Sequence, residues 1–149
     1  MPEIPWQMQD LPLMKFSRQF LSLTFPAGIA GKRLVDLGCL EGGYAVEFAR
    51  DGFDTLGIEV RQSNFKNCQR VKAATNLPQA INLPHLSFVC GDVRNLENPG
   101  VFDAIFCCGI LYHVDEPRKF MEQMSRVAVS LSIRMWLPNS QIVSSRSRK

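Results

Sequence analysis

Residues 33–45 read Arg-Leu-Val-Asp-Leu-Gly-Cys-Leu-Glu-Gly-Gly-Tyr-Ala, and this stretch decides the fold. An apolar run through Leu34, Val35 and Leu37 stops at a glycine-rich turn, and a helical pattern begins at about Gly43. A strand, a glycine turn and a helix in this order bring backbone close to a nucleotide-like ligand at the carboxyl end of the strand. The stretch therefore predicts an α/β protein with a ligand site at this turn.

Strand and helix patterns alternate along the rest of the chain. We expect strands at 33–37, 53–60, 86–90, 102–108 and 129–135, and helices at 13–25, 43–50, 63–75 and 116–127. Ser63 is the expected N-cap of the third helix. The strands at 86–90 and 102–108 are nearly continuous apolar runs, which are typical of strands covered on both faces. This order predicts a Rossmann-like, doubly wound and mostly parallel sheet in a three-layer α/β/α arrangement.

The composition is that of one globular domain. The chain has 149 residues, of which 46% are hydrophobic and 21% charged, and this balance excludes a disordered protein. We expect a lead-in with one helix at 1–32, a ligand-binding domain at 33–136 and a disordered Ser/Arg-rich tail at 137–149. Arg146, Arg148 and Lys149 account for the net charge of +3, so the body is neutral and nucleic acid is not an expected partner.

The cysteines follow neither a disulfide framework nor a metal-ligand spacing. There are five of them, at positions 39, 68, 90, 107 and 108, which predicts free thiols in a reducing compartment and no metal site. The N-terminus lacks the basic start and apolar core of a signal peptide, and no run reaches membrane-spanning length. We therefore expect a cytoplasmic protein without membrane contact.

Acidic residues lie at the carboxyl ends of three expected strands: Asp36, Glu59 and Asp92. Carboxylates are costly to bury, and open α/β sheets bind ligands at this edge, so the three indicate a site for hydroxyls, an amine and a cation. Glu59 lies 23 residues after Asp36, where an acidic side chain can accept hydrogen bonds from both hydroxyls of a ribose.

Asp36 bears on the identity of the ligand because it stands inside the strand, just before the turn. There it would face a pyrophosphate with like charge, whereas a ligand with a sulfonium and an amine would be attracted. This favours S-adenosylmethionine over NAD. The glycine spacing also does not fit Gly-x-Gly-x-x-Gly, so an NAD-dependent oxidoreductase is the less favoured alternative.

Four motifs follow one another along the chain: Val35-Asp36-Leu37-Gly38-Cys39-x-Glu41-Gly42-Gly43, Gly57-Ile58-Glu59, Gly91-Asp92-Val93 and Phe102-Asp103-Ala104-Ile105-Phe106. In this order they resemble the class I S-adenosylmethionine-dependent methyltransferases over residues 33–126. The resemblance implies S-adenosylmethionine as the cofactor and transfer of its methyl group to an acceptor, which we expect to be a small molecule.

The resemblance also implies which residues hold the cofactor. Asp36, Gly38 and nearby backbone would hold the methionine end, Glu59 the ribose, and Asp92 with the Val93 backbone the adenine. The full expected set is Asp36, Gly38, Cys39, Glu41, Gly43, Glu59, Val60, Asp92, Val93 and Cys108.

Tyr112 and His113 follow the fourth strand, where the family places residues beside the transferred methyl group. Methyl transfer from a sulfonium is an in-line displacement, so catalysis consists of positioning and, where needed, removal of a proton from the acceptor. His113 is the expected base, and Tyr112 would orient the acceptor or line its pocket.

The chain departs from the family pattern at two places. Leu40 stands where the family usually has a second glycine, and its side chain could crowd the cofactor. The family's sheet usually has seven strands ending in an antiparallel hairpin, but this sequence has room for about five, as in a C-terminally truncated member. We expect the open sheet edge to be covered by an oligomer or another partner. A methyltransferase-like binding module without turnover is therefore the second hypothesis.

Overall fold

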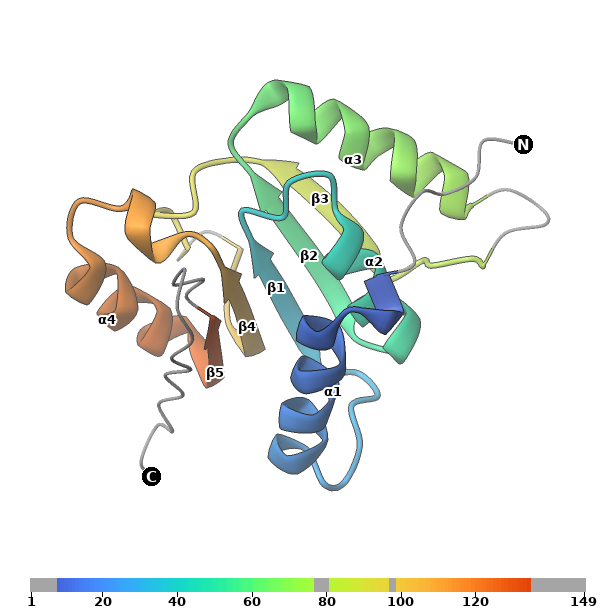
Figure 1. Ribbon diagram of the computed structural model, residues 1–149, viewed down its shortest axis with the longest axis horizontal. Coiled ribbons are helices and arrows are strands. Elements are labelled where there is room, and N and C mark those ends of the chain that lie inside the picture. Colours follow the sequence, from blue (N-terminus) through green and yellow to red (C-terminus); the bar gives the residue numbers. More distant parts are fainter. Residues whose placement is uncertain (1–7, 77–80, 97–98, 135–149) are drawn as a thin grey trace.

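The described residues form a sheet of five parallel strands, with the strand order β3-β2-β1-β4-β5 (Figure 1). The strands are β1 (Arg33–Leu37), β2 (Asp54–Glu59), β3 (Leu86–Cys90), β4 (Phe102–Cys108) and β5 (Ala128–Arg134). The computed structural model describes residues 8–76, 81–96 and 99–134. The tail expected at 137–149 lies outside the described residues.

Helices cover both faces of the sheet: α1 (Pro12–Thr24), α2 (Gly43–Asp51) and α3 (Gln62–Thr75) on one, and α4 (Pro117–Val127) on the other. On the first face, the buried side chains Met14 and Leu21 of α1 and Phe48 of α2 pack against Leu34 of β1 and Phe106 of β4. On the second face the packed residues include Val35, Ile105, Phe120 and Met124. The predicted three-layer, Rossmann-like α/β fold is confirmed.

The start of α3 corrects one prediction. The helix begins at Gln62, its N-cap is Arg61, and Ser63 is not the cap. The chain turns into the helix directly after β2, and the Glu59 carboxylate accepts the Arg61 N–H at 2.8 Å. A carboxylate at the strand end thus binds a backbone amide at the start of the helix, where a serine cap was expected.

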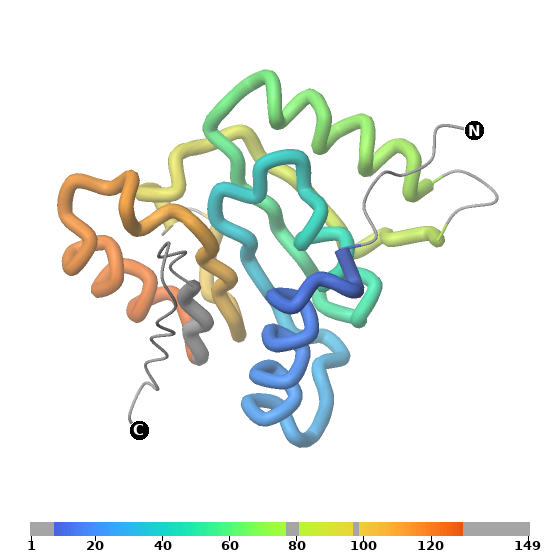
Figure 2. The backbone as a smooth tube through the Cα atoms, viewed as in Figure 1, coloured from blue at the N-terminus to red at the C-terminus, as the bar shows by residue number. Residues whose placement is uncertain are grey.

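The position of β3 corrects a second prediction. Leu86 is buried, but Ser87, Val89 and Cys90 are exposed, with Val89 at 44%. The strand lies at an edge of the sheet, and the described residues between β3 and β4 form no helix that would cover its α4 side (Figure 2). An apolar run therefore indicated a strand correctly, but it could not indicate cover on both faces.

Arg18 fastens the lead-in helix to α2. Its guanidinium donates to both carboxylate oxygens of Asp51, at 2.8 and 2.9 Å, and to Glu47 at 2.9 Å. Glu47 is only 2% exposed, and Arg50 donates to its other oxygen at 2.9 Å. Because a buried carboxylate needs paired charges, this network holds α1 in place over α2, next to the glycine turn.

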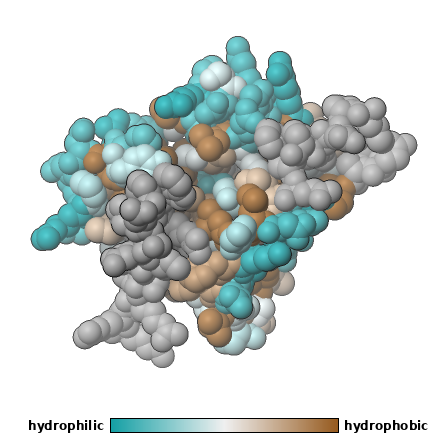
Figure 3. Space-filling model, viewed as in Figure 1, coloured by the Kyte–Doolittle hydropathy of each residue, from teal (hydrophilic) through white to brown (hydrophobic). Residues whose placement is uncertain are grey.

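The outward sides of α3 and α4 are mostly hydrophilic (Figure 3). On α3, for example, Lys66, Gln69 and Arg70 are exposed. Within the part of the chain that the structure describes, no helix combines the length and the hydropathy needed to cross a membrane.

Candidate functional site

A cavity of about 460 Å³ lies at the carboxyl ends of the strands. Eight of the twelve residues expected to bind the cofactor or act on the acceptor line it: Gly38, Glu59, Val60, Asp92, Val93, Cys108, Tyr112 and His113. The carboxyl ends of parallel strands meet at one edge, which is why residues so far apart in the sequence converge here.

The glycine turn after β1 depends on left-handed backbone. Gly38 has φ = 65° and Gly42 has φ = 86°. A Cβ at Gly38 would overlap the Ile110 side chain, and a Cβ at Gly42 would lie 2.5 Å from the Phe88 ring. Only glycine fits both the backbone angle and the space at these two positions.

Leu40 adopts the left-handed conformation for which the family's glycine is suited, with φ = 53°. It is the one residue other than glycine with positive φ among those described. Its N–H donates to Glu59 Oε2 at 3.0 Å, and its carbonyl accepts from the Cys68 thiol at 3.0 Å. The side chain is 61% exposed and lines the cavity, so crowding of the cofactor by Leu40 stays a prediction.

Glu59 is held rigidly at the end of β2 and is 3% exposed. One carboxylate oxygen accepts the Leu40 N–H at 3.0 Å and the other accepts the Arg61 N–H at 2.8 Å. Each oxygen keeps further lone-pair capacity, so this carboxylate can still accept hydrogen bonds from two hydroxyl groups.

Asp36 lies behind the glycine turn and is 2% exposed. The Ala45 N–H, in the first turn of α2, donates to the carboxylate, yet Oδ2 has no hydrogen-bond partner among the described residues. Burial raises the pKa of Asp36 to about 7, and the charge of Glu59 adds to this shift. A buried carboxylate oxygen without a partner is costly, so the site suits a cationic donor such as an ammonium group.

Asp92 follows β3 and is held by Arg94. The Arg94 N–H donates to Oδ1 at 2.9 Å, and the guanidinium donates to both oxygens, with Nε at 2.9 Å from each. This contact holds the pKa of Asp92 below its usual range.

Tyr112 and His113 lie in a short 3₁₀ turn, Leu111–His113, directly after β4. Both side chains are exposed and line the cavity, and their ring centroids are 4.2 Å apart. The turn thus brings an imidazole and a phenol to the lining of the strand-end cavity.

Four expected cofactor residues do not line the cavity: Asp36, Cys39, Glu41 and Gly43. The Cys39 thiol is buried 3.9 Å from that of Cys68, and Glu41 accepts from Asn67 Nδ2 at 2.9 Å, so both side chains contact α3. Gly43 lies beneath the Met8 side chain. Contacts of these residues with a cofactor stay predictions.

The cavity also has lining residues that the sequence did not single out: Arg61, Arg94, Gly109, Ile110, Val114 and Asp115. Each lies within two residues of one that was expected, so the strand ends were the right signal. Which neighbour faces the cavity depends on turn geometry, which short sequence patterns do not specify.

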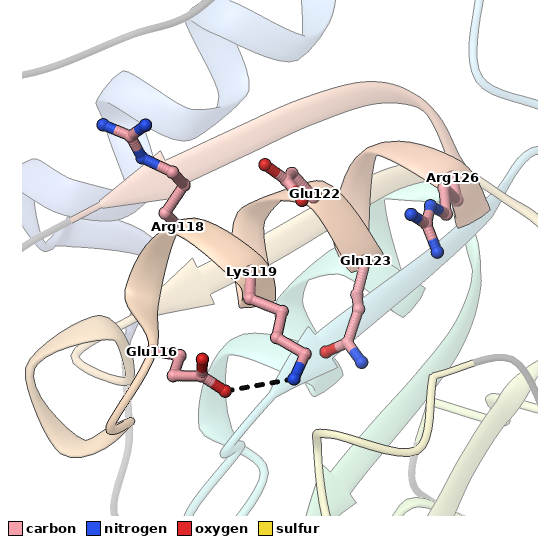
Figure 4. Close-up of a pocket in the computed structure, with 6 residues that line it drawn as sticks. All are labelled: Glu116, Arg118, Lys119, Glu122, Gln123 and Arg126. Carbon is pink, nitrogen blue, oxygen red and sulfur yellow. Dashed lines mark hydrogen bonds and ion pairs between the residues drawn. The ribbon is translucent and has the colours of Figure 1, made fainter.

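A second hollow, of about 430 Å³, runs along α4 and carries different chemistry (Figure 4). It is lined by Glu116, Arg118, Lys119, Glu122, Gln123 and Arg126. Glu116 and Lys119 form an exposed ion pair at 3.1 Å. Mixed charges along one helix are typical of a solvated face, so the strand-end cavity is the better candidate site.

Residues 35–130, well over half of the chain, match the family model described as a methyltransferase domain. The chain belongs to the class I S-adenosylmethionine-dependent methyltransferases. S-adenosylmethionine is the cofactor of this family, as the sequence predicted. Membership of this family does not favour the alternative of an NAD-dependent oxidoreductase.

Among curated relatives, this chain is similar to the ubiquinone biosynthesis O-methyltransferase of Chromobacterium violaceum, with 32% identity over 101 residues. That match covers 66% of this chain and 40% of the relative. Norajmaline N-methyltransferase of Rauvolfia serpentina is 32% identical over 99 residues, covering 65% of this chain and 32% of that protein. The chain thus spans 40% or less of the length of these two relatives.

Solved structures have the same fold. The N-terminal domain of EvdMO1, with S-adenosylhomocysteine bound, is 29% identical and superposes with a TM-score of 0.65, covering 78% of this chain and 46% of that chain. Magnesium protoporphyrin IX methyltransferase from Synechocystis PCC 6803 has a TM-score of 0.63 over 78% of this chain and 55% of its own. At 19% identity the second match supports the fold alone.

Proposed function

We propose that this chain binds S-adenosylmethionine in the strand-end cavity and transfers the methyl group to a small-molecule acceptor. One observation carries the proposal: three successive strands bring Asp36, Glu59 and Asp92 to the same edge, and buried Asp36 has an oxygen without a partner among the described residues. A ligand with an ammonium group, a ribose, an exocyclic amine and no phosphate matches these three carboxylates.

The chain's residues would orient this cofactor from one end to the other. Asp36 would accept from the ammonium group, Glu59 from the ribose hydroxyls, and Asp92 from the adenine amine. The bound cofactor supplies a methyl group activated by the sulfonium. Positioning of that group toward the rim at Tyr112 and His113 is then the main task of the protein.

The acceptor would enter at this rim. We propose that His113 takes the proton that an oxygen or nitrogen nucleophile loses on methylation, while Tyr112 orients the acceptor. An imidazole is suited to this role near neutral pH. The curated relatives named above include an O- and an N-methyltransferase, which supports an acceptor atom of either kind.

Calorimetric titration with S-adenosylhomocysteine tests the cofactor site. Glu59→Ala should weaken binding by roughly 1–3 kcal/mol, because the ribose hydroxyls lose their acceptor. Arg118→Gln is the control, since Arg118 is exposed on α4 and does not line the strand-end cavity. No binding to the wild-type protein at high micromolar ligand would refute the proposal.

A binding module without turnover is the second candidate, and Leu40 at the cavity rim is the observation that favours it. Cofactor binding without methyl transfer across a panel of phenols, carboxylates and amines would support this candidate. A partner or second copy along the β5 edge, and a cytoplasmic location, are further proposals. The latter rests on the cysteines, none of which forms a disulfide among the described residues, as suits a reducing compartment.

A further inference from the structure

Arg94 binds the Asp92 carboxylate, which is the group proposed above to accept a hydrogen bond from the adenine amine of the cofactor. Its Nε lies 2.9 Å from both oxygens of Asp92, and a second guanidinium nitrogen donates to Oδ2. The Arg94 side chain is 64% exposed and that of Asp92 is 29% exposed, so a ligand in the cavity can reach the pair.

A second place for the guanidinium lies close by. The loop after β3 runs alongside the segment between β4 and α4 (Figures 1 and 2). A hollow of about 170 Å³ between them is lined by Arg94, Val114, Asp115, Glu116, Lys119, Phe120 and Gln123. Asp115 also lines the strand-end cavity and attracts the Arg94 charge. Arg94 can therefore leave Asp92 for another carboxylate without crossing the molecule.

We propose that Arg94 competes with the adenine amine for Asp92 and thereby sets how strongly the site selects an adenine over a 6-oxopurine. This inference rests on the proposed cofactor site. The amine and the guanidinium are both donors, so adenine binds only where Arg94 gives up part of its contact with Asp92. A 6-oxopurine presents an N1–H donor to Asp92 and an oxygen acceptor to Arg94, so both protein groups stay paired.

The test measures two ligands that differ at this edge, S-adenosylhomocysteine and S-inosylhomocysteine, by titration calorimetry. Arg94→Gln should bind the adenosyl ligand about 1.5-fold to fivefold more tightly, the range expected for releasing an exposed ion pair. It should bind the inosyl ligand more weakly than wild type. Arg94→Lys keeps the charge but not the bidentate contact, so its affinity for each ligand should lie between those of the wild type and Arg94→Gln.

Salt gives an independent readout. Added salt screens an exposed ion pair, so wild-type affinity for the adenosyl ligand should rise relative to that of Arg94→Gln. Arg118→Gln removes the same charge from α4, where Arg118 points away from the Glu116–Lys119 pair (Figure 4), and should leave the ratio of the two affinities unchanged.

Two results would overturn the inference. One is a folded Arg94→Gln protein that binds S-adenosylhomocysteine no more tightly than wild type. The other is an unchanged affinity ratio for the two ligands. A wild-type protein that binds neither ligand would instead refute the proposed function itself.

Discussion

Replacement of Asp36 by Asn should remove most of the pH dependence of stability between about pH 4 and pH 7. The carboxylate is buried, one of its oxygens has no partner in the part of the chain that the structure describes, and burial raises its pKa from 3.8 to about 7. The folded state therefore binds the proton more tightly than the unfolded state does. Stability is highest below the unfolded-state pKa and falls as the pH rises through the folded-state value.

The size of this effect follows from the shift. About three pKa units at 1.36 kcal/mol each amount to roughly 4 kcal/mol of stability lost by pH 8. Asn has no charge to desolvate and keeps an oxygen that can accept the Ala45 N–H. The constant cost of burying its amide shifts the whole stability curve but not its slope.

Urea denaturation from pH 4.5 to 8 measures how the free energy of unfolding changes with pH. Titration with S-adenosylhomocysteine at pH 8 measures how much affinity Asp36→Asn loses. Asp36→Asn should bind more weakly by about 1.5–3 kcal/mol, the contribution of a hydrogen bond to a charged group. Glu122→Gln, an exposed carboxylate on α4, is the control and should change neither quantity. An Asp36→Asn protein with the wild-type pH slope would refute the reasoning.

Two further predictions concern the turn and the lead-in helix. Leu40→Gly should relieve about 1 kcal/mol of left-handed backbone strain and tighten S-adenosylhomocysteine binding by opening the rim; weaker binding would show that the side chain supports the ligand. Arg18→Ala should lower the free energy of unfolding by about 1–3 kcal/mol because buried Glu47 loses one of its two guanidinium partners. Lys15→Ala on the same helix, whose ion pair with Asp10 is exposed, should change stability by less than about 0.5 kcal/mol in the same urea experiment.

The sequence by itself determined the order of the elements and the edge where the site lies. β1, β3 and β4 have the predicted bounds, and the other elements begin and end within one residue of theirs. These features are local, because an apolar run, a glycine turn or an acidic residue at a strand end indicates its place without reference to the rest of the chain.

Only the tertiary structure decided how the site's side chains are paired. Within the described residues, it brought Arg94 onto Asp92, left one oxygen of Asp36 without a partner, and turned Glu41 toward α3. It also put β3 at an edge of the sheet. The burial and the hydrogen-bond partners of a side chain depend on which elements become neighbours. Of two side chains close together in the sequence, one can face the cavity and the other a helix. The sequence thus indicated where the carboxylates would meet, and packing set the hydrogen-bond partners of each.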